Sequence, residues 1–119
     1  MMTDRVIFIG WGNAVRGREQ ASQRVFQEAV EYWSRLQAAG EIESFDVVLL
    51  DAHGGDLGGF FLLKGEREKL TRVRASEEME RLMVRANVIV EGLGAVGGVT
   101  GDGVAQQLAA FLEASGSLG

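Results

Sequence analysis

The sequence contains no cysteine and no proline, and it has a single histidine. Without cysteine the chain can form no disulfide, and a thiol nucleophile or a thiolate metal site is excluded as well. This absence is typical of a reducing compartment, so we expect a cytoplasmic protein. Because proline is missing, the 17 glycines must make nearly all of the turns.

Long apolar runs and an excess of positive charge are missing too. No apolar stretch approaches the ~20 residues that a membrane-spanning helix needs, so no membrane association is expected. The opening residues, 1–5, lack the basic segment and the apolar run of a signal peptide. The formal net charge of -5 disfavours nucleic acid as a partner, since affinity for phosphate backbones comes mostly from Lys and Arg.

The composition is that of a folded domain. The 119 residues are 46% hydrophobic and 24% charged, which excludes a disordered chain. A chain of this length is long enough to bury a core of its own, and we expect one domain over residues 1–119.

Four short runs of the sequence are predicted to be strands: residues 5–11, 42–50, 59–64 and 88–93. In the last three, apolar side chains fill both faces, since neighbours such as Val47 and Val48 point in opposite directions. Leaving large apolar side chains in water costs roughly 1.5–3 kcal/mol each. About six of them would cancel a typical domain stability of roughly 5–15 kcal/mol. The sequence therefore predicts a homodimer in which a second copy covers the face that the helices leave open.

Helices are predicted over residues 18–39, 66–74, 77–86 and 102–114. Residues at three- and four-residue spacing give the first helix a single buried face: Ser22, Val25, Phe26, Ala29, Trp33 and Leu36. Ser76 is a good N-cap between the second and third helices. The last helix has one apolar stripe, and through Phe111 and Leu112 we expect it to reinforce the contact between two copies.

The order of elements is β-α-β-β-α-β with an added C-terminal helix, which predicts an α+β, ferredoxin-like fold. On this order, and on the segment from Gly65 to Leu82, the chain resembles the dimeric α/β-barrel superfamily. That segment is similar to the second helix of YCII-related and monooxygenase-like members, where a Gly-x-x-x-x-Leu opening precedes a capping serine and an acidic turn. The resemblance implies two sheets packed face to face, with a pocket in or beside the barrel.

Asp51 and His53 are the candidate catalytic residues. They follow the second predicted strand, and residues two apart share a face if the extended conformation persists. A carboxylate beside the only histidine could fix the tautomer of the imidazole and make it a general acid or base. YCII-related proteins carry a His–Asp pair in their pocket, which this pair resembles. The alternative is that His53 is an exposed turn residue and Asp51 accepts backbone hydrogen bonds.

Trp11, Asn13 and Glu91 are the candidate ligand-binding residues. Trp11 ends the first strand on the face of Ile7 and Ile9, and Asn13 could hydrogen-bond a ligand. Cofactor-free oxygenases of the superfamily hold an aromatic substrate with Trp and Asn, so the resemblance implies a similar use here. Packing and a turn are the alternatives for these two residues. Glu91 interrupts an apolar strand, either as a pocket residue or as a solvated residue of an edge strand.

No cofactor and no metal are expected. Residues 92–97 match G-x-G-x-x-G, but the sequence ends at Gly119, before the rest of a dinucleotide-binding unit. One histidine without cysteine makes a poor metal site.

Three functions stay open. A protein that binds a small apolar or aromatic ligand predicts an apolar pocket that depends on Trp11 and not on His53. A small enzyme, either a cofactor-free oxygenase or an acid–base catalyst that uses His53 and Asp51, predicts a pocket around that pair. A purely structural dimeric subunit predicts a filled barrel.

Overall fold

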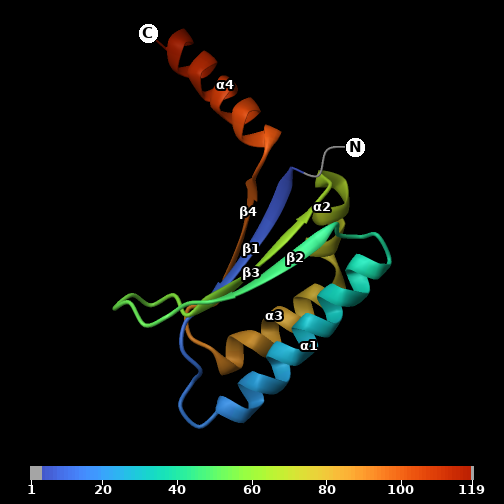
Figure 1. Ribbon diagram of the computed structural model, residues 1–119, viewed down its shortest axis with the longest axis vertical. Helices are drawn as coiled ribbons and strands as arrows, with labels where there is room; N and C mark the ends of the chain where they lie inside the picture. Colours follow the sequence, from blue (N-terminus) through green and yellow to red (C-terminus); the bar gives the residue numbers. More distant parts are fainter. Residues whose placement is uncertain (1–3, 119) are drawn as a thin grey trace.

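The computed structural model describes residues 4–118, so residues 1–3 and 119 of the predicted domain lie outside the described part. It shows a four-stranded antiparallel sheet with helices against one face (Figure 1). The strands are β1 (Arg5–Trp11), β2 (Ser44–Leu49), β3 (Gly59–Gly65) and β4 (Gly94–Val99), in the order β2-β3-β1-β4. The helices are α1 (Glu19–Ala38), α2 (Arg67–Ala75), α3 (Glu77–Ile89) and α4 (Asp102–Ser117). The predicted α+β, ferredoxin-like class is confirmed.

The register of the sheet decides which side chains meet the helices. Ile7 lies opposite Leu63, and Ile9 lies opposite Phe61. Paired residues share a face, and these four side chains are buried beneath the helices. The alternate side chains form what we call the open face: Val6, Phe8, Val48, Phe60, Leu62 and Val96. Apolar residues on both faces are therefore confirmed for β2 and β3.

Helices α1 and α3 lie side by side against the core face of the sheet (Figure 1). The stripe predicted for α1 faces inward, with Val25, Ala29 and Trp33 buried. Leu82 and Ile89 of α3 are buried as well. The two helices and the sheet thus enclose one hydrophobic core.

The fourth strand lies further along the chain than the sequence pattern predicts. A strand was expected over residues 88–93, but α3 continues to Ile89 and β4 begins at Gly94. The physical reason is that Leu82, Ala86 and Ile89 keep helical spacing, and burial of Ile89 completes the inward stripe. The glycine-rich segment expected to be a connection is the strand itself, because an edge strand can be held by backbone hydrogen bonds to one neighbour. Most of the G-x-G-x-x-G match at residues 92–97 therefore belongs to the edge strand β4.

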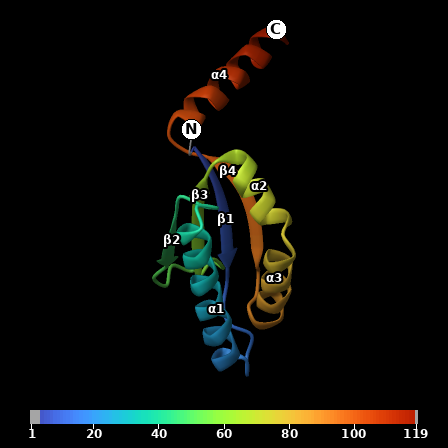
Figure 2. The same ribbon diagram turned by 90° about the vertical axis from the view of Figure 1, so that its right-hand side faces the viewer.

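Helix α4 leaves the end of β4 and extends away from the sheet (Figures 1 and 2). Its predicted apolar stripe is exposed, with Phe111 at 68% and Leu112 at 67% of full exposure. The Cα radius of gyration is 16.3 Å, whereas a compact chain of this length would have about 13.5 Å. None of the helices within residues 4–118 combines the length and hydropathy that a membrane span requires.

Ser76 ends α2 and caps α3, as the sequence predicts. The backbone N–H of Met79 donates to its Oγ at 3.2 Å. We expect Ser76→Ala to lower the free energy of unfolding by about 1 kcal/mol, because that N–H loses its acceptor. Urea denaturation followed by circular dichroism measures the change. Ser34→Ala is the matched control, since the Ser34 hydroxyl donates only to the Val30 carbonyl within α1. An equal loss in both variants would contradict the capping role.

Candidate functional site

Three loops meet at one end of the sheet and form what we call the loop junction: residues 11–13, 56–58 and 89–92. The Gly12 N–H donates to the carbonyl oxygen of Glu91 at 2.7 Å, and the Glu91 N–H donates to that of Asn13 at 2.9 Å. The Gly58 N–H donates to the carbonyl oxygen of Trp11 at 2.7 Å. Backbone hydrogen bonds therefore join the end of β1 to both of the other loops.

The loop junction lines an open groove of about 470 Å³. Three of the predicted site residues, Trp11, Asn13 and Glu91, lie around this groove together with Asp56. Asn13 and Glu91 are exposed, and Glu91 belongs to the loop after α3 rather than to a strand. Because the charged residues of the lining, Asp56 and Glu91, are both acidic, the groove favours neutral or cationic ligands over anions.

A smaller cavity of about 60 Å³ lies between the sheet and helices α1 and α3. Its lining is almost entirely apolar and includes Ile9, Trp11, Val25, Phe26, Phe61 and Leu93. The Trp11 ring packs 4.8 Å from Phe61 and 6.1 Å from Phe26, between ring centroids. Trp11 lines both spaces, so the apolar cavity and the polar groove lie next to each other at this residue.

Trp33 is a lining residue of this apolar cavity and has one buried polar atom. The side chain lines the cavity and is 1% exposed, and its Nε1 has no hydrogen-bond partner within residues 4–118. A buried donor without an acceptor costs about 1–3 kcal/mol. Sequence reasoning treated Trp33 as core packing. One feature of the sequence could have pointed to Trp33: its indole N–H lies on a helical stripe that faces apolar strands, where acceptors are scarce.

His53 lies in the exposed hairpin between β2 and β3, where the backbone of the hairpin engages its ring. The Gly55 N–H donates to Nδ1 at 3.2 Å, and Nε2 lies 2.8 Å from the Leu57 carbonyl oxygen. Since Nδ1 accepts, we assign the proton to Nε2, which donates to Leu57. β2 ends at Leu49, so the ladder stops before Asp51. Within residues 4–118 no hydrogen bond or ion pair joins Asp51 to His53, and their catalytic role stays a prediction.

Metal-ligating side chains are dispersed in this structure. Nowhere within residues 4–118 do three or more His, Asp or Glu side chains come together in a way that could hold a metal ion.

The fold is similar to solved structures, whereas the sequence matches no family model and none of the curated proteins. A dimeric protein of unknown function and ferredoxin-like fold from Bacteroides fragilis is 14% identical, with a TM-score of 0.56 over 80% of this chain and 95% of that chain. A DABB family protein with a ferredoxin-like fold from Mesorhizobium loti is 13% identical, with a TM-score of 0.57 over 81% and 96%. SnoaB, a cofactor-independent oxygenase from Streptomyces nogalater, is 14% identical, with a TM-score of 0.52 over 82% and 92%.

These likenesses confirm the predicted ferredoxin-like fold. At such low identity a shared fold does not carry an activity with it. The resemblance to YCII-related proteins stays a prediction.

Gly12 allows the loops of the junction to approach closely. A Cβ at this position would lie 2.8 Å from the Asp56 carbonyl oxygen and 3.0 Å from that of Glu91. We expect Gly12→Ala to lower the free energy of unfolding by about 1–3 kcal/mol, since backbone atoms must move apart. In Gly94→Ala, the control, the new Cβ meets no atom within 4 Å, and we expect a change below about 0.5 kcal/mol. Thermal unfolding of both variants measures the difference, and equal losses would contradict the close packing.

Proposed function

We propose that this protein binds a small molecule in the cavity between the sheet and helices α1 and α3. The observation that carries the proposal is an almost entirely apolar cavity lined by Trp33, a residue whose indole N–H is buried without a partner. A ligand with an apolar body and one acceptor atom would fill the space and satisfy this donor. About 60 Å³ holds only a few non-hydrogen atoms, so a larger ligand extends past Trp11 into the groove.

The groove supports a ligand with a second, polar end. Asn13 offers an amide that both donates and accepts, and Glu91 offers a carboxylate beside it. We therefore infer a small apolar or aromatic molecule whose buried end meets Trp33 and whose polar end lies near Asn13 and Glu91. An uncharged or cationic polar end suits the acidic lining.

This proposal competes with the two other functions that the sequence leaves open. The cavity speaks against a purely structural subunit, whose interior would be filled. The engagement of both ring nitrogens of His53 by the hairpin speaks for a turn role of this residue. An enzyme that uses His53 and Asp51, or a cofactor-free oxygenase, remains the alternative, and the variants below separate it from a binding protein.

The chain contains two tryptophans, and both line the cavity, so their indole N–H signals in a ¹H–¹⁵N spectrum report on this site. Phenol and toluene are suitable probes, because they have similar shapes and only phenol carries an acceptor oxygen. We expect saturable shifts with both probes, and a downfield shift of the Trp33 indole proton with phenol alone. Shifts that do not saturate with either probe would contradict the proposal.

Ala86→Leu tests the position of the ligand, because Ala86 lines the cavity and a larger side chain fills it. We expect this variant to weaken phenol binding about tenfold or more. Ala38→Leu, at the exposed end of α1, is the control that adds the same side chain elsewhere. His53→Ala should leave binding unchanged, and lost binding in this variant with an unchanged melting temperature would favour the His53 enzyme.

We also propose that two copies pack open face to open face. The Phe8 and Phe60 rings, with centroids 4.9 Å apart, form an apolar centre on that face, and Val96 beside them is 58% exposed. A sheet with apolar residues on both faces is typically covered on both. The Bacteroides fragilis protein with this fold is described as dimeric, which supports the same assembly here.

The exposed stripe of α4 fits this assembly. Val104, Leu108, Phe111 and Leu112 are all exposed while α4 projects from the end of β4 (Figure 2). An apolar helix that reaches beyond its own domain gains burial by packing on a second copy. The helix would then stabilise the dimer rather than the fold of one subunit.

Sedimentation velocity at micromolar concentration tests the assembly, and we expect a particle of twice 12.9 kDa. Leu62→Lys should prevent dimer formation, because it places a charge on the apolar open face. The subunit should stay folded, since Asp46 lies opposite position 62 and can pair with the lysine. Val84→Lys, at a 62% exposed position of α3, is the control that should remain dimeric. Removal of residues 102–119 should lower the melting temperature. A monomeric wild-type protein would overturn the proposal.

A further inference from the structure

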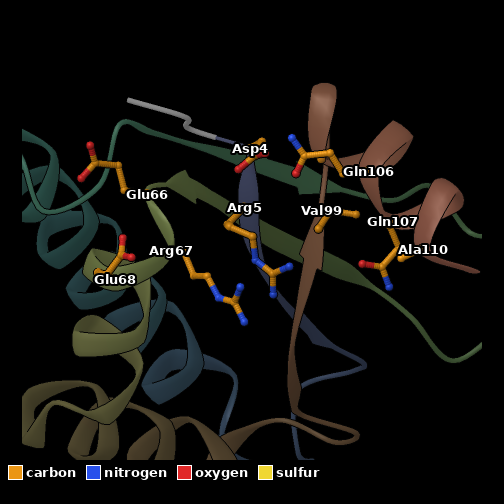
Figure 3. Close-up of a pocket in the computed structure, with 10 residues that line it drawn as sticks. Asp4, Arg5, Glu66, Arg67, Glu68, Val99, Gln106, Gln107 and Ala110 are labelled. Atoms are coloured by element: carbon orange, nitrogen blue, oxygen red, sulfur yellow. The ribbon is translucent and has the colours of Figure 1, made fainter.

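Three arginines come together at the end of the sheet opposite the loop junction. Arg5 begins β1, and Arg67 and Arg74 lie at the two ends of α2. All three line one cleft of about 180 Å³, together with Gly97 of β4. Figure 3 shows the guanidinium groups of Arg5 and Arg67 turned toward the same space beside β4. We call this site the arginine cleft.

Gly97 keeps the cleft open. A Cβ at this position would lie 3.4 Å from Nη1 of Arg74 and 4.0 Å from Nη2 of Arg5. Both guanidinium groups therefore reach the same point above the backbone of β4. The other terminal nitrogen of Arg74, Nη2, donates to the carbonyl oxygen of Ala95 at 3.0 Å, which fixes its orientation over the strand.

Among the described residues, the lining of the arginine cleft contains no Asp or Glu. Within residues 4–118, none of the three arginines forms an ion pair, whereas Arg35, Arg72, Arg81 and Arg85 each pair with a glutamate.

Three carboxylates, those of Asp4, Glu66 and Glu68, line a larger neighbouring pocket of about 600 Å³ together with Arg5 and Arg67. Within residues 4–118, none of the three forms an ion pair with either arginine. Glu66 lies 4.0 Å from Lys69, and Asp4 faces the start of α4, where its Oδ2 would lie 3.1 Å from a Cβ at Gly103. Figure 3 shows this larger pocket, with Asp4, Glu66 and Glu68 drawn together with Arg5 and Arg67.

Unpaired like charges this close repel each other, and an anion between them would replace the repulsion with charge-assisted hydrogen bonds. We propose that the arginine cleft binds an oxyanion, with the phosphate group of a small molecule as the best fit. Guanidinium groups present their donors in a planar fork that matches phosphate oxygens. Three of them balance a doubly charged phosphate better than a singly charged carboxylate. Gly97 lets the anion approach the strand without a side chain in the way.

The site is separate from the cavity of the proposed function. Arg5 and Trp11 are the two ends of β1, and no residue of the arginine cleft lines the cavity or the groove. The acidic groove disfavours anions, whereas the arginine cleft favours them, so the two sites differ in the charge of the ligand that they bind.

Inorganic phosphate is the probe, added to the full chain at low ionic strength, with the backbone amide of Gly97 followed by ¹H–¹⁵N spectroscopy. We expect a saturable shift that weakens as sodium chloride is added, because the arginines are partly exposed. Arg67→Gln should weaken binding about tenfold, the loss of one charge-assisted hydrogen-bonding group. Gly97→Ala should weaken binding too, because its Cβ enters the cleft.

Arg81→Gln is the matched control, since it removes the same charge from an exposed position of α3. Acetate in place of phosphate distinguishes a site for phosphate groups from one for oxyanions in general. A shift that does not saturate, or equal weakening in Arg67→Gln and Arg81→Gln, would overturn the proposal. The Trp33 indole signal should not respond to phosphate, so failure here is distinguishable from failure of ligand binding in the cavity.

Discussion

Helices α1, α2 and α3 cover the sheet on one side only, and the rest of the molecule follows from that constraint. On the covered side, Ile7, Ile9, Phe61 and Leu63 pack beneath the helices and form the core. On the other side the same strands present Phe8, Phe60 and Leu62. Helix α2 completes this cover with Leu70 and Val73. The apolar second face is a surface for another layer.

The covered side is not filled completely, and its two ends differ. At one end the aromatic side chains Trp11, Phe26 and Phe61 pack around a small cavity and leave the indole N–H of Trp33 without an acceptor. At the other end α2 brings arginines over a glycine of β4. The cavity exists because large rings that meet at angles leave space that small apolar side chains would fill. The arginine cleft exists because glycine in a strand leaves the backbone accessible.

Much of the fold could be predicted because its signals are local. The alternation of β3 and the three- and four-residue spacing of α1 follow from the period of each element, and both agree with the structure. The fourth strand was misplaced because residues 88–93 are apolar and short, a pattern that a strand and a helix end share. Residues 94–99, which form the strand, have a composition that disfavours strands and are held by pairing with β1.

The candidate sites could be predicted only in part, since each joins residues far apart in the chain. Sequence reasoning named Trp11, Asn13 and Glu91, but their meeting depends on the bonds that join the end of β1 to the loop after α3. The sequence did not reveal the unpartnered N–H of Trp33 or the arginine cleft. Whether a donor or a charge has a partner depends on residues from distant parts of the chain that fold around it.

The order of the elements, the face to which most side chains point and the surplus of apolar surface can be read from the residues in chain order, because periodicity is a property of neighbouring residues. Which loops meet, which donor stays without an acceptor and which charges lack a partner depend on strand order and register, so these features become visible only once the chain is folded.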